Sequence, residues 1–156
     1  MKYHDLMKWQ GNILLKEIAE DVALDEGALK IKIERCKVSD KTVSVIEFDD
    51  VVIEANPIEV DSELPIIELE FSSYVSYSVI NESFAPFQDY EVYEGSLFRI
   101  YSKSRYLDFI KLRTFAVDIF PDLVHYQIPC LNHIIDIISN EVPIVTEINR
   151  YTMKRM

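Results

Sequence analysis

The sequence of 156 residues contains little glycine and little proline, and it has no stretch with the composition of a flexible linker. Only three glycines and six prolines interrupt the chain, and no internal repeat is visible. Apolar residues make up 49% of the sequence, and a chain of this length buries roughly two thirds of its unfolded surface on folding. These values exclude intrinsic disorder. We therefore predict one folded domain that spans residues 1–156.

Segments that would direct the chain into or across a membrane are also missing. The first ten residues contain no apolar run that ends in a small-residue cleavage site, so no signal peptide is predicted. No window approaches the ~20 apolar residues of a membrane-spanning helix. We expect a cytoplasmic protein in which Cys36 and Cys130 are reduced, buried thiols. Cys130 follows Pro129 in an apolar run, which should raise the pKa of its thiol and make it unreactive.

Motifs that carry catalysis or bind a cofactor are absent. The sequence contains no glycine-rich phosphate loop, no Gly-x-Ser-x-Gly and no His-Glu-x-x-His, so we predict no cofactor and no metal site. His125, Cys130, His133 and Asp136 fall within twelve residues of sequence. Their spacing matches none of the ligand pairs of zinc sites. We expect packed histidines here rather than a catalytic centre.

Basic residues are missing from Thr42 to Phe98, and this absence is the most informative one. The span of 57 residues contains no Lys or Arg, whereas the rest of the chain has 14 acidic and 16 basic residues. The net charge of −11 therefore arises entirely within this span. Its thirteen carboxylates are Glu47, Asp49, Asp50, Glu54, Glu59, Asp61, Glu63, Glu68, Glu70, Glu82, Asp89, Glu91 and Glu94. This charge opposes binding through nucleic-acid phosphates, so we expect no nucleic-acid partner.

The acidic span has three interpretations that the charge pattern alone leaves open. It is a solvated face that keeps the protein soluble, a docking face for a basic protein, or a divalent-metal site. The absence of an Asp-x-Asp-x-Asp-Gly loop counts against the metal site. For the docking face, a charge reversal of Glu68 and Glu70 to Lys should slow association. The residues expected to contact the basic partner are Glu47, Asp49, Asp50, Glu68, Glu70 and Tyr74.

Alternating apolar and polar residues predict strands over most of the first hundred positions. In Ile66–Ile80 the odd-numbered residues are mostly apolar and should face a core. This run is too long for one ordinary strand, so we expect a bend or bulge near Ser72 and Ser73. The other expected strands are Leu29–Glu34, Asn12–Ile18, Thr42–Phe48, Val51–Ala55 and Tyr90–Tyr101.

The apolar period changes after Ser104. Residues 104–117 match an amphipathic helix, in which the hydroxyl of Ser102 or Ser104 caps the first free amides. Basic residues on this segment are expected to pair with the acidic strands or to coat the exposed helix face. Leu131–Ser139 fits a buried strand or a short helix, and we favour the helix. The overall prediction is an α+β fold, an antiparallel twisted sheet of about six strands with one main helix of the C-terminal half packed on it.

Three stretches carry a resemblance to a known group of proteins. They are Tyr77–Ala85 (YSVINESFA), Tyr101–Phe109 (YSKSRYLDF) and His125–Ser139 (HYQIPCLNHIIDIIS). The sequence resembles small bacterial proteins that are found beside polymorphic or contact-dependent toxins and are regarded as immunity proteins. The resemblance implies a non-enzymatic inhibitor that occludes a basic toxin domain. It supplies no functional residues that could be transferred to this chain.

A second interpretation competes with the inhibitor. The protein would then be an enzyme or a small-ligand binder whose pocket lies between the helix and the sheet. His125, His133 and Glu82 would provide the polar lining of that pocket. Convergence of these side chains in one cavity would favour this interpretation over the docking face.

Overall fold

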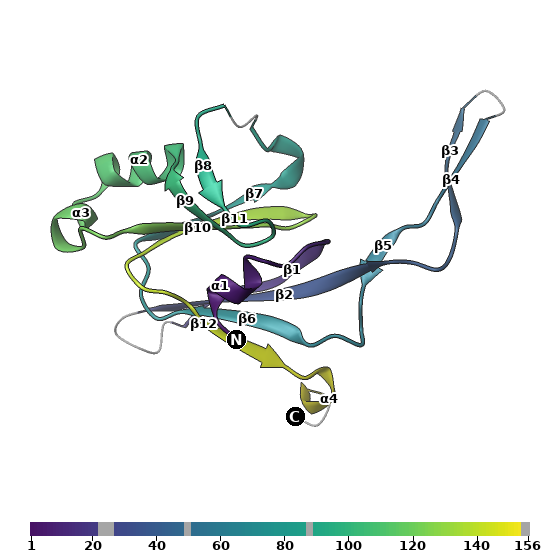
Figure 1. Cartoon of the computed structure of the whole chain (residues 1–156), viewed down its shortest axis with the longest axis horizontal. Helices are drawn as coiled ribbons and strands as arrows, with labels where there is room; N and C mark the ends of the chain where they lie inside the picture. Colours follow the sequence, from purple (N-terminus) through teal and green to yellow (C-terminus); the bar gives the residue numbers. More distant parts are fainter. Residues whose placement is uncertain (22–26, 49–50, 87–88, 154–156) are drawn as a thin grey trace.

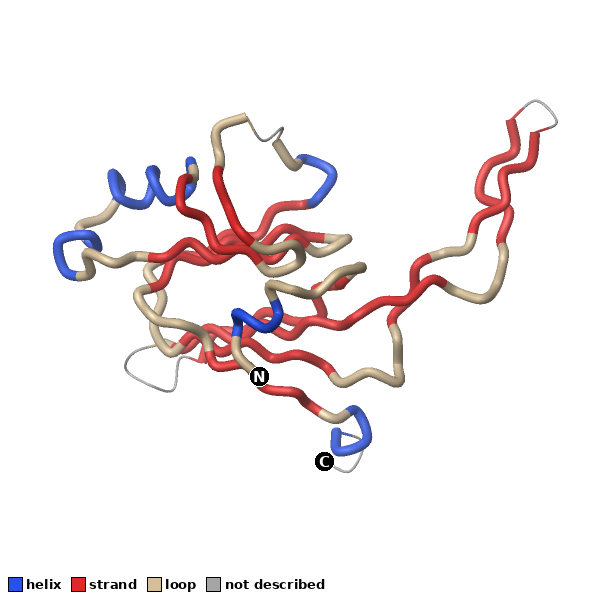
Figure 2. Tube along the Cα trace, viewed as in Figure 1, coloured by secondary structure: helices blue, strands red, loops and turns tan. Residues whose placement is uncertain are grey.

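The computed structural model describes residues 1–21, 27–48, 51–86 and 89–153. The chain forms an α+β fold in which most of the strands belong to antiparallel sheets. Two sheets lie face to face, and a separate hairpin extends away from them (Figures 1 and 2). None of the helices in the described residues has the length and apolar composition needed to cross a membrane.

The first sheet is built around two strands whose alternating side chains face the interior. Its order is β1–β2–β6–β12, and β5 pairs with the far end of β2. The strands are β1 (Ile13–Asp21), β2 (Ala28–Val38), β5 (Ile58–Val60), β6 (Ile66–Phe71) and β12 (Ile144–Ile148). On the inner face, Ile31 of β2 and Leu69 of β6 are paired in register, and neither exposes any surface. The alternation predicted for these two strands is confirmed.

The second sheet contains the strands from the C-terminal half of the chain together with β7. Its order is β7–β11–β10–β9–β8, and every pair in it is antiparallel. The strands are β7 (Ser76–Asn81), β8 (Val92–Glu94), β9 (Arg99–Lys103), β10 (Val124–Pro129) and β11 (His133–Ser139). A short 3-10 helix, η1 (Glu82–Phe84), follows β7.

The main core lies between the two sheets. Buried aliphatic residues of β2 and β6 face buried residues of β10 and β11, including Tyr126 and Ile135. Helix α1 (Tyr3–Leu6) adds the Tyr3 ring, which packs edge to face against Phe98 at 5.9 Å and Tyr126 at 5.0 Å. Such aromatic pairs add stability beyond the area that they bury.

Helix α2 (Arg105–Arg113) packs on the outer face of the second sheet, as Figure 1 shows. The Ser104 hydroxyl accepts a hydrogen bond from the Leu107 amide at 3.0 Å, so Ser104, and not the alternative Ser102, is the cap. Leu107 and Ile110 form a second, smaller core cluster with Leu123 and Ile138.

A two-stranded hairpin contains the remaining strands of the described residues. Its strands, β3 (Val43–Phe48) and β4 (Val51–Ala55), pair with each other and, within the described residues, with no other strand. Figures 1 and 2 show it extending far beyond the two stacked sheets. At its base the Ser39 amide donates a hydrogen bond to the Pro57 carbonyl oxygen at 2.7 Å. We call residues 40–48 and 51–56 the hairpin arm.

The prediction of a single sheet of about six strands is wrong, because the described residues form two five-stranded sheets and a hairpin. The predicted strand Ile66–Ile80 is interrupted between Phe71 and Ser76, at the position where a bend was expected. The two halves, β6 and β7, enter different sheets. After the interruption, Tyr77 still packs against the main core, whereas Val75 joins the smaller cluster beneath α2 and Val79 is 41% exposed.

The prediction of one main helix is also wrong. The helical pattern over residues 104–117 divides into α2 and the short α3 (Ala116–Ile119). Thr114 between them has an extended backbone, with φ −130° and ψ 163°, and its hydroxyl donates to the Ile110 carbonyl oxygen at 2.9 Å. A four-residue helix, α4 (Arg150–Met153), follows β12.

The segment Leu131–Ser139 contains the strand β11 instead of the favoured helix. β11 is hydrogen-bonded to β10 on one side and to β7 on the other. Ile135 and Ile137 face the main core, whereas Ile138 packs in the cluster beneath α2. Because both faces of this strand are covered, its sequence is a nearly continuous apolar run.

Candidate functional site

Glu68 and Glu70, two of the predicted partner-binding residues, lie on the outer face of the first sheet. Register pairs Lys30 with Glu70 and Lys32 with Glu68 across β2 and β6. The Lys30 Nζ atom lies 3.5 Å from a Glu70 carboxylate oxygen. The Lys32 Nζ atom lies 2.6 Å from Glu17 on the other side of β2. This face therefore carries mixed charge rather than a continuous acidic surface.

The other predicted contact residues do not join that face. Tyr74 lies in the interruption between β6 and β7, and its ring packs against Tyr77 and the main core. Its hydroxyl donates to a Glu20 carboxylate oxygen at 3.0 Å. Glu47 belongs to β3 of the hairpin arm. Asp49 and Asp50 lie outside the described residues.

The hairpin arm carries exposed aliphatic side chains on both of its strands. Val51, Val52 and Ile53 of β4 retain 59%, 52% and 50% of their surface exposed, and Val43 of β3 is also exposed. Three consecutive exposed residues of a strand cover both of its faces. In sequence, residues 40–56 contain five carboxylates and one lysine. The arm therefore combines exposed aliphatic side chains with excess negative charge.

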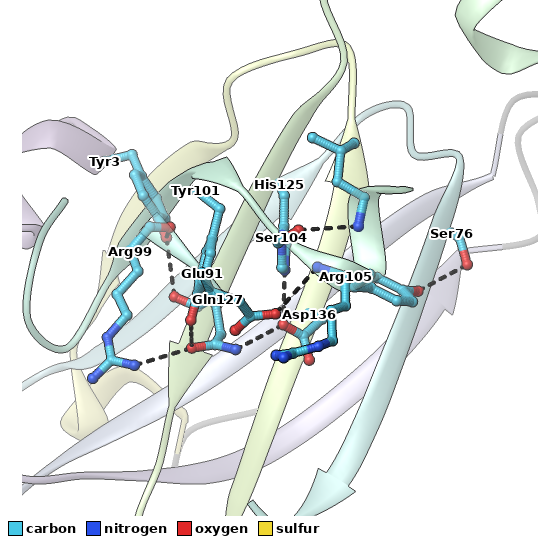
Figure 3. Close-up of polar contacts among 12 residues, drawn as sticks. Tyr3, Ser76, Glu91, Arg99, Tyr101, Ser104, Arg105, His125, Gln127 and Asp136 are labelled. Atoms are coloured by element: carbon cyan, nitrogen blue, oxygen red, sulfur yellow. Dashed lines mark hydrogen bonds and ion pairs between the residues drawn. The ribbon is translucent and has the colours of Figure 1, made fainter. Parts of the chain in front are cut away.

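A buried polar network lies on the outer face of the second sheet (Figure 3). At one end, Gln127 Oε1 accepts hydrogen bonds from Arg99 Nη1 at 3.1 Å and from the Tyr101 hydroxyl at 2.7 Å. The Gln127 amide nitrogen then donates to Asp136 Oδ1 at 2.9 Å. Because a guanidinium has only donors, it fixes which way the Gln127 amide is turned. Burial raises the pKa of Tyr101 to about 12, so this hydroxyl stays protonated.

The network continues through His125. Its Nε2 atom lies 2.7 Å from Asp136 Oδ1, and its Nδ1 atom lies 2.7 Å from Ser104 Oγ. Ser104 Oγ already accepts the Leu107 amide, so we assign the hydroxyl hydrogen to the bond with Nδ1. That assignment leaves the imidazole proton on Nε2, which donates to Asp136. The expectation of a packed histidine at position 125 is confirmed, because its side chain is buried and hydrogen-bonded at both nitrogens.

Ser104, His125 and Asp136 are the residue types of a hydrolytic triad, but their arrangement differs from one. In such a triad the hydroxyl bonds to Nε2 of the histidine and stands where a substrate can reach it. Here Ser104 bonds to Nδ1, exposes 0% of its surface and caps α2. The geometry therefore gives Ser104 a structural role.

A cavity of about 310 Å³ opens beside this network, between α2 and the second sheet. Apolar walls come from Ile80 of β7, Phe109 of α2 and Ile134 of β11. Polar lining comes from residues on the sheet, including His125 and Asp136. A pocket between helix and sheet was the second interpretation of the sequence, and one of its three predicted lining residues, His125, is present here.

The remaining predicted pocket residues lie elsewhere. Glu82 lines a neighbouring cavity of about 340 Å³ together with Cys130. His133, on β11, has a buried Nδ1 atom that bonds to no described residue, and His133 does not line the cavity beneath α2. Within the described part of the chain, no three His, Cys, Asp or Glu side chains lie close enough together to hold a metal ion.

The two cysteines are free thiols in different surroundings. Cys130 is buried, and burial raises its pKa to about 12, which confirms the predicted direction. Cys36 is half-buried instead of buried. It belongs to β2, and partial burial raises the pKa of its thiol.

The basic residues that follow the acidic span are partly paired with it, as expected. The Arg105 guanidinium bonds to Asp89 and holds the pKa of that carboxyl below its usual range. The Lys103 ammonium lies 4.0 Å from the centre of the Tyr90 ring. Lys111 and Arg113 are exposed on α2.

Comparison with known proteins adds no relative to this description. No family model, no curated protein and no solved structure matches the chain.

Proposed function

We propose that this protein is a non-enzymatic inhibitor, acting in the cytoplasm as an immunity protein, that binds a basic toxin domain. The hairpin arm is the observation that carries the proposal. Aliphatic side chains exposed on both faces of a projecting hairpin are unfavourable in water and are typical of a surface that a partner covers. The carboxylates among them select a partner of positive charge.

The backbone of the arm supports the same conclusion. A two-stranded hairpin without a core is only marginally stable by itself in water. Within the described residues, β3 and β4 each have one edge that no other strand occupies. A partner that adds a strand to one edge would bury aliphatic side chains and satisfy backbone groups at the same time.

Charge pairing favours the arm over the outer face of the first sheet as the primary contact. Lys30 lies next to Glu70, and Lys32 is in register with Glu68, so the field of these carboxylates is partly cancelled. The described part of the arm contains a single base, Lys41. Contact through Glu68 and Glu70 stays a prediction, and we place it second.

The test uses the domain encoded at the end of the neighbouring upstream reading frame as the partner. We expect a small basic domain that arrests growth of a bacterial host when it is expressed alone. Coexpression of the present protein should restore growth, and a variant without the hairpin arm should not. An upstream frame without a basic domain, or growth arrest that the intact protein does not relieve, would reject the inhibitor.

A further inference from the structure

The cavity beneath α2 contains a hydrogen-bond acceptor that no described residue uses. Asp136 exposes only 6% of its surface and lines this cavity. His125 and Gln127 both bond to its Oδ1 atom, at 2.7 and 2.9 Å. Among the described residues, none donates to Oδ2. Because Oδ2 has no donor among these residues and is not fully buried, a donor from outside the fold can reach it.

The cations that line the cavity are already engaged. Arg99 donates to the Ser96 carbonyl oxygen and to Gln127, and its guanidinium lies 4.3 Å from the centre of the Tyr93 ring. Arg105 pairs with Asp89. The group without a hydrogen-bond partner in the cavity is therefore an acceptor, Asp136 Oδ2. A ligand that binds there should supply a hydrogen-bond donor.

The side chains around Asp136 indicate the polarity and the size of the rest of the ligand. Phe109, which is 55% exposed, joins Ile80 and Ile134 in an apolar wall. The volume of about 310 Å³ is at the lower end of the range of small-molecule sites, which is about 300–1,000 Å³. An apolar body of modest size fits this space, and its donor would face the carboxylate.

We propose that this cavity binds a small apolar molecule that carries a protonated amine. The ammonium donates to Asp136 Oδ2 in a charge-assisted hydrogen bond, while the apolar body packs against Phe109 and Ile134. His125 and Gln127 position the carboxylate by holding its other oxygen. This site is independent of the hairpin arm, so it does not rest on the proposed inhibitor.

The experiment compares four probes of one shape: benzylamine, benzyl alcohol, toluene and benzoate. Binding is followed by NMR through the shifts of Tyr106, Phe109, His125 and Ile134. Benzylamine should bind at least ~10-fold more tightly than toluene, because a hydrogen bond to a charged group is added. Benzyl alcohol should be intermediate and benzoate weakest. Benzoate binding as tightly as benzylamine, or benzylamine shifts absent from these residues, would overturn the proposal.

Three variants locate the interaction. Asp136→Asn keeps an acceptor for His125 but places an amide where Oδ2 stood, so benzylamine should lose about 10-fold in affinity while toluene is unchanged. Phe109→Ala, at an exposed position, should weaken every probe. Leu112→Ala, on the same helix but 90% exposed and outside the cavity, should change nothing. Benzylamine affinity unchanged in both Asp136→Asn and Phe109→Ala would contradict the site.

Discussion

At the scale of single residues, some carboxylates are neutralised by ion pairs within the fold, whereas unpaired ones remain available to a partner. Glu34 on β2 accepts hydrogen bonds from Lys16 at 3.0 Å and Arg150 at 2.7 Å. Burial alone would raise the pKa of Glu34, but these two bonds outweigh it and lower the pKa. Arg150 also donates to the Leu64 carbonyl oxygen, so Glu34 anchors α4 to the first sheet.

Glu34 gives a prediction with a defined dependence on pH. Because its folded-state pKa lies below the unfolded value of about 4.3, the charged form stabilises the fold above that pH. This contribution disappears as the pH falls through the folded-state pKa. Glu34→Gln should lower the free energy of unfolding by about 0.5–1 kcal/mol at pH 7 and by less at pH 3. Urea unfolding at the two pH values measures the difference.

The matched control for Glu34 is Glu147→Gln on β12. Glu147 is exposed and forms no ion pair among the described residues. Its substitution should leave the unfolding free energy unchanged at both pH values. An equal loss for Glu34→Gln at pH 7 and pH 3 would contradict the electrostatic account of the anchor.

At the scale of elements, the sequence predicted those features that depend on local pattern. Alternation identified β2 and β6, and a serine before an apolar helical period indicated a cap at Ser102 or Ser104, of which the structure uses Ser104. β11 was ambiguous because a strand covered on both faces has no alternation to display. The helix over residues 104–117 was overextended because its apolar period continues through Thr114 into α3.

We predict that the two stacked sheets fold stably without the hairpin arm. Ser39 and Pro57 are already linked by a backbone hydrogen bond at the base of the arm. Replacing residues 40–56 by Asn-Gly should close β2 and β5 with a tight turn. No described residue of the arm belongs to either core cluster, so the melting temperature should change by less than about 4 °C, equivalent to about 1 kcal/mol.

Thermal unfolding followed by circular dichroism checks that expectation. A loss of cooperative unfolding, or a much larger fall in melting temperature, would mean that the arm is part of the folded core. The same variant then shows, in a binding experiment, whether a partner binds to the arm or to the stacked sheets.

At the scale of the whole molecule, the sequence could predict an acidic region but not which of its carboxylates are free. Lys30 and Lys32 precede the acidic span, and only the register of β2 against β6 brings them beside Glu70 and Glu68. The candidate site on the second sheet was partly visible, because His125 and Asp136 were noted together. The contributions of Gln127 and Ser104 depend on strand pairing and on the packing of α2, which no local pattern encodes.

The central claim is that the hairpin arm binds a basic partner, and capture on three matched columns tests it most directly. The columns carry the intact protein, the variant without the arm and Glu68→Gln/Glu70→Gln, and a lysate of the source organism is applied to each. We predict that a basic protein is retained by the first and third columns but not by the second. It should elute steeply between low and moderate salt, where the Debye length is about 10 Å at 0.1 M. Equal retention without the arm, retention of only acidic or neutral proteins, or elution indifferent to salt would contradict the account.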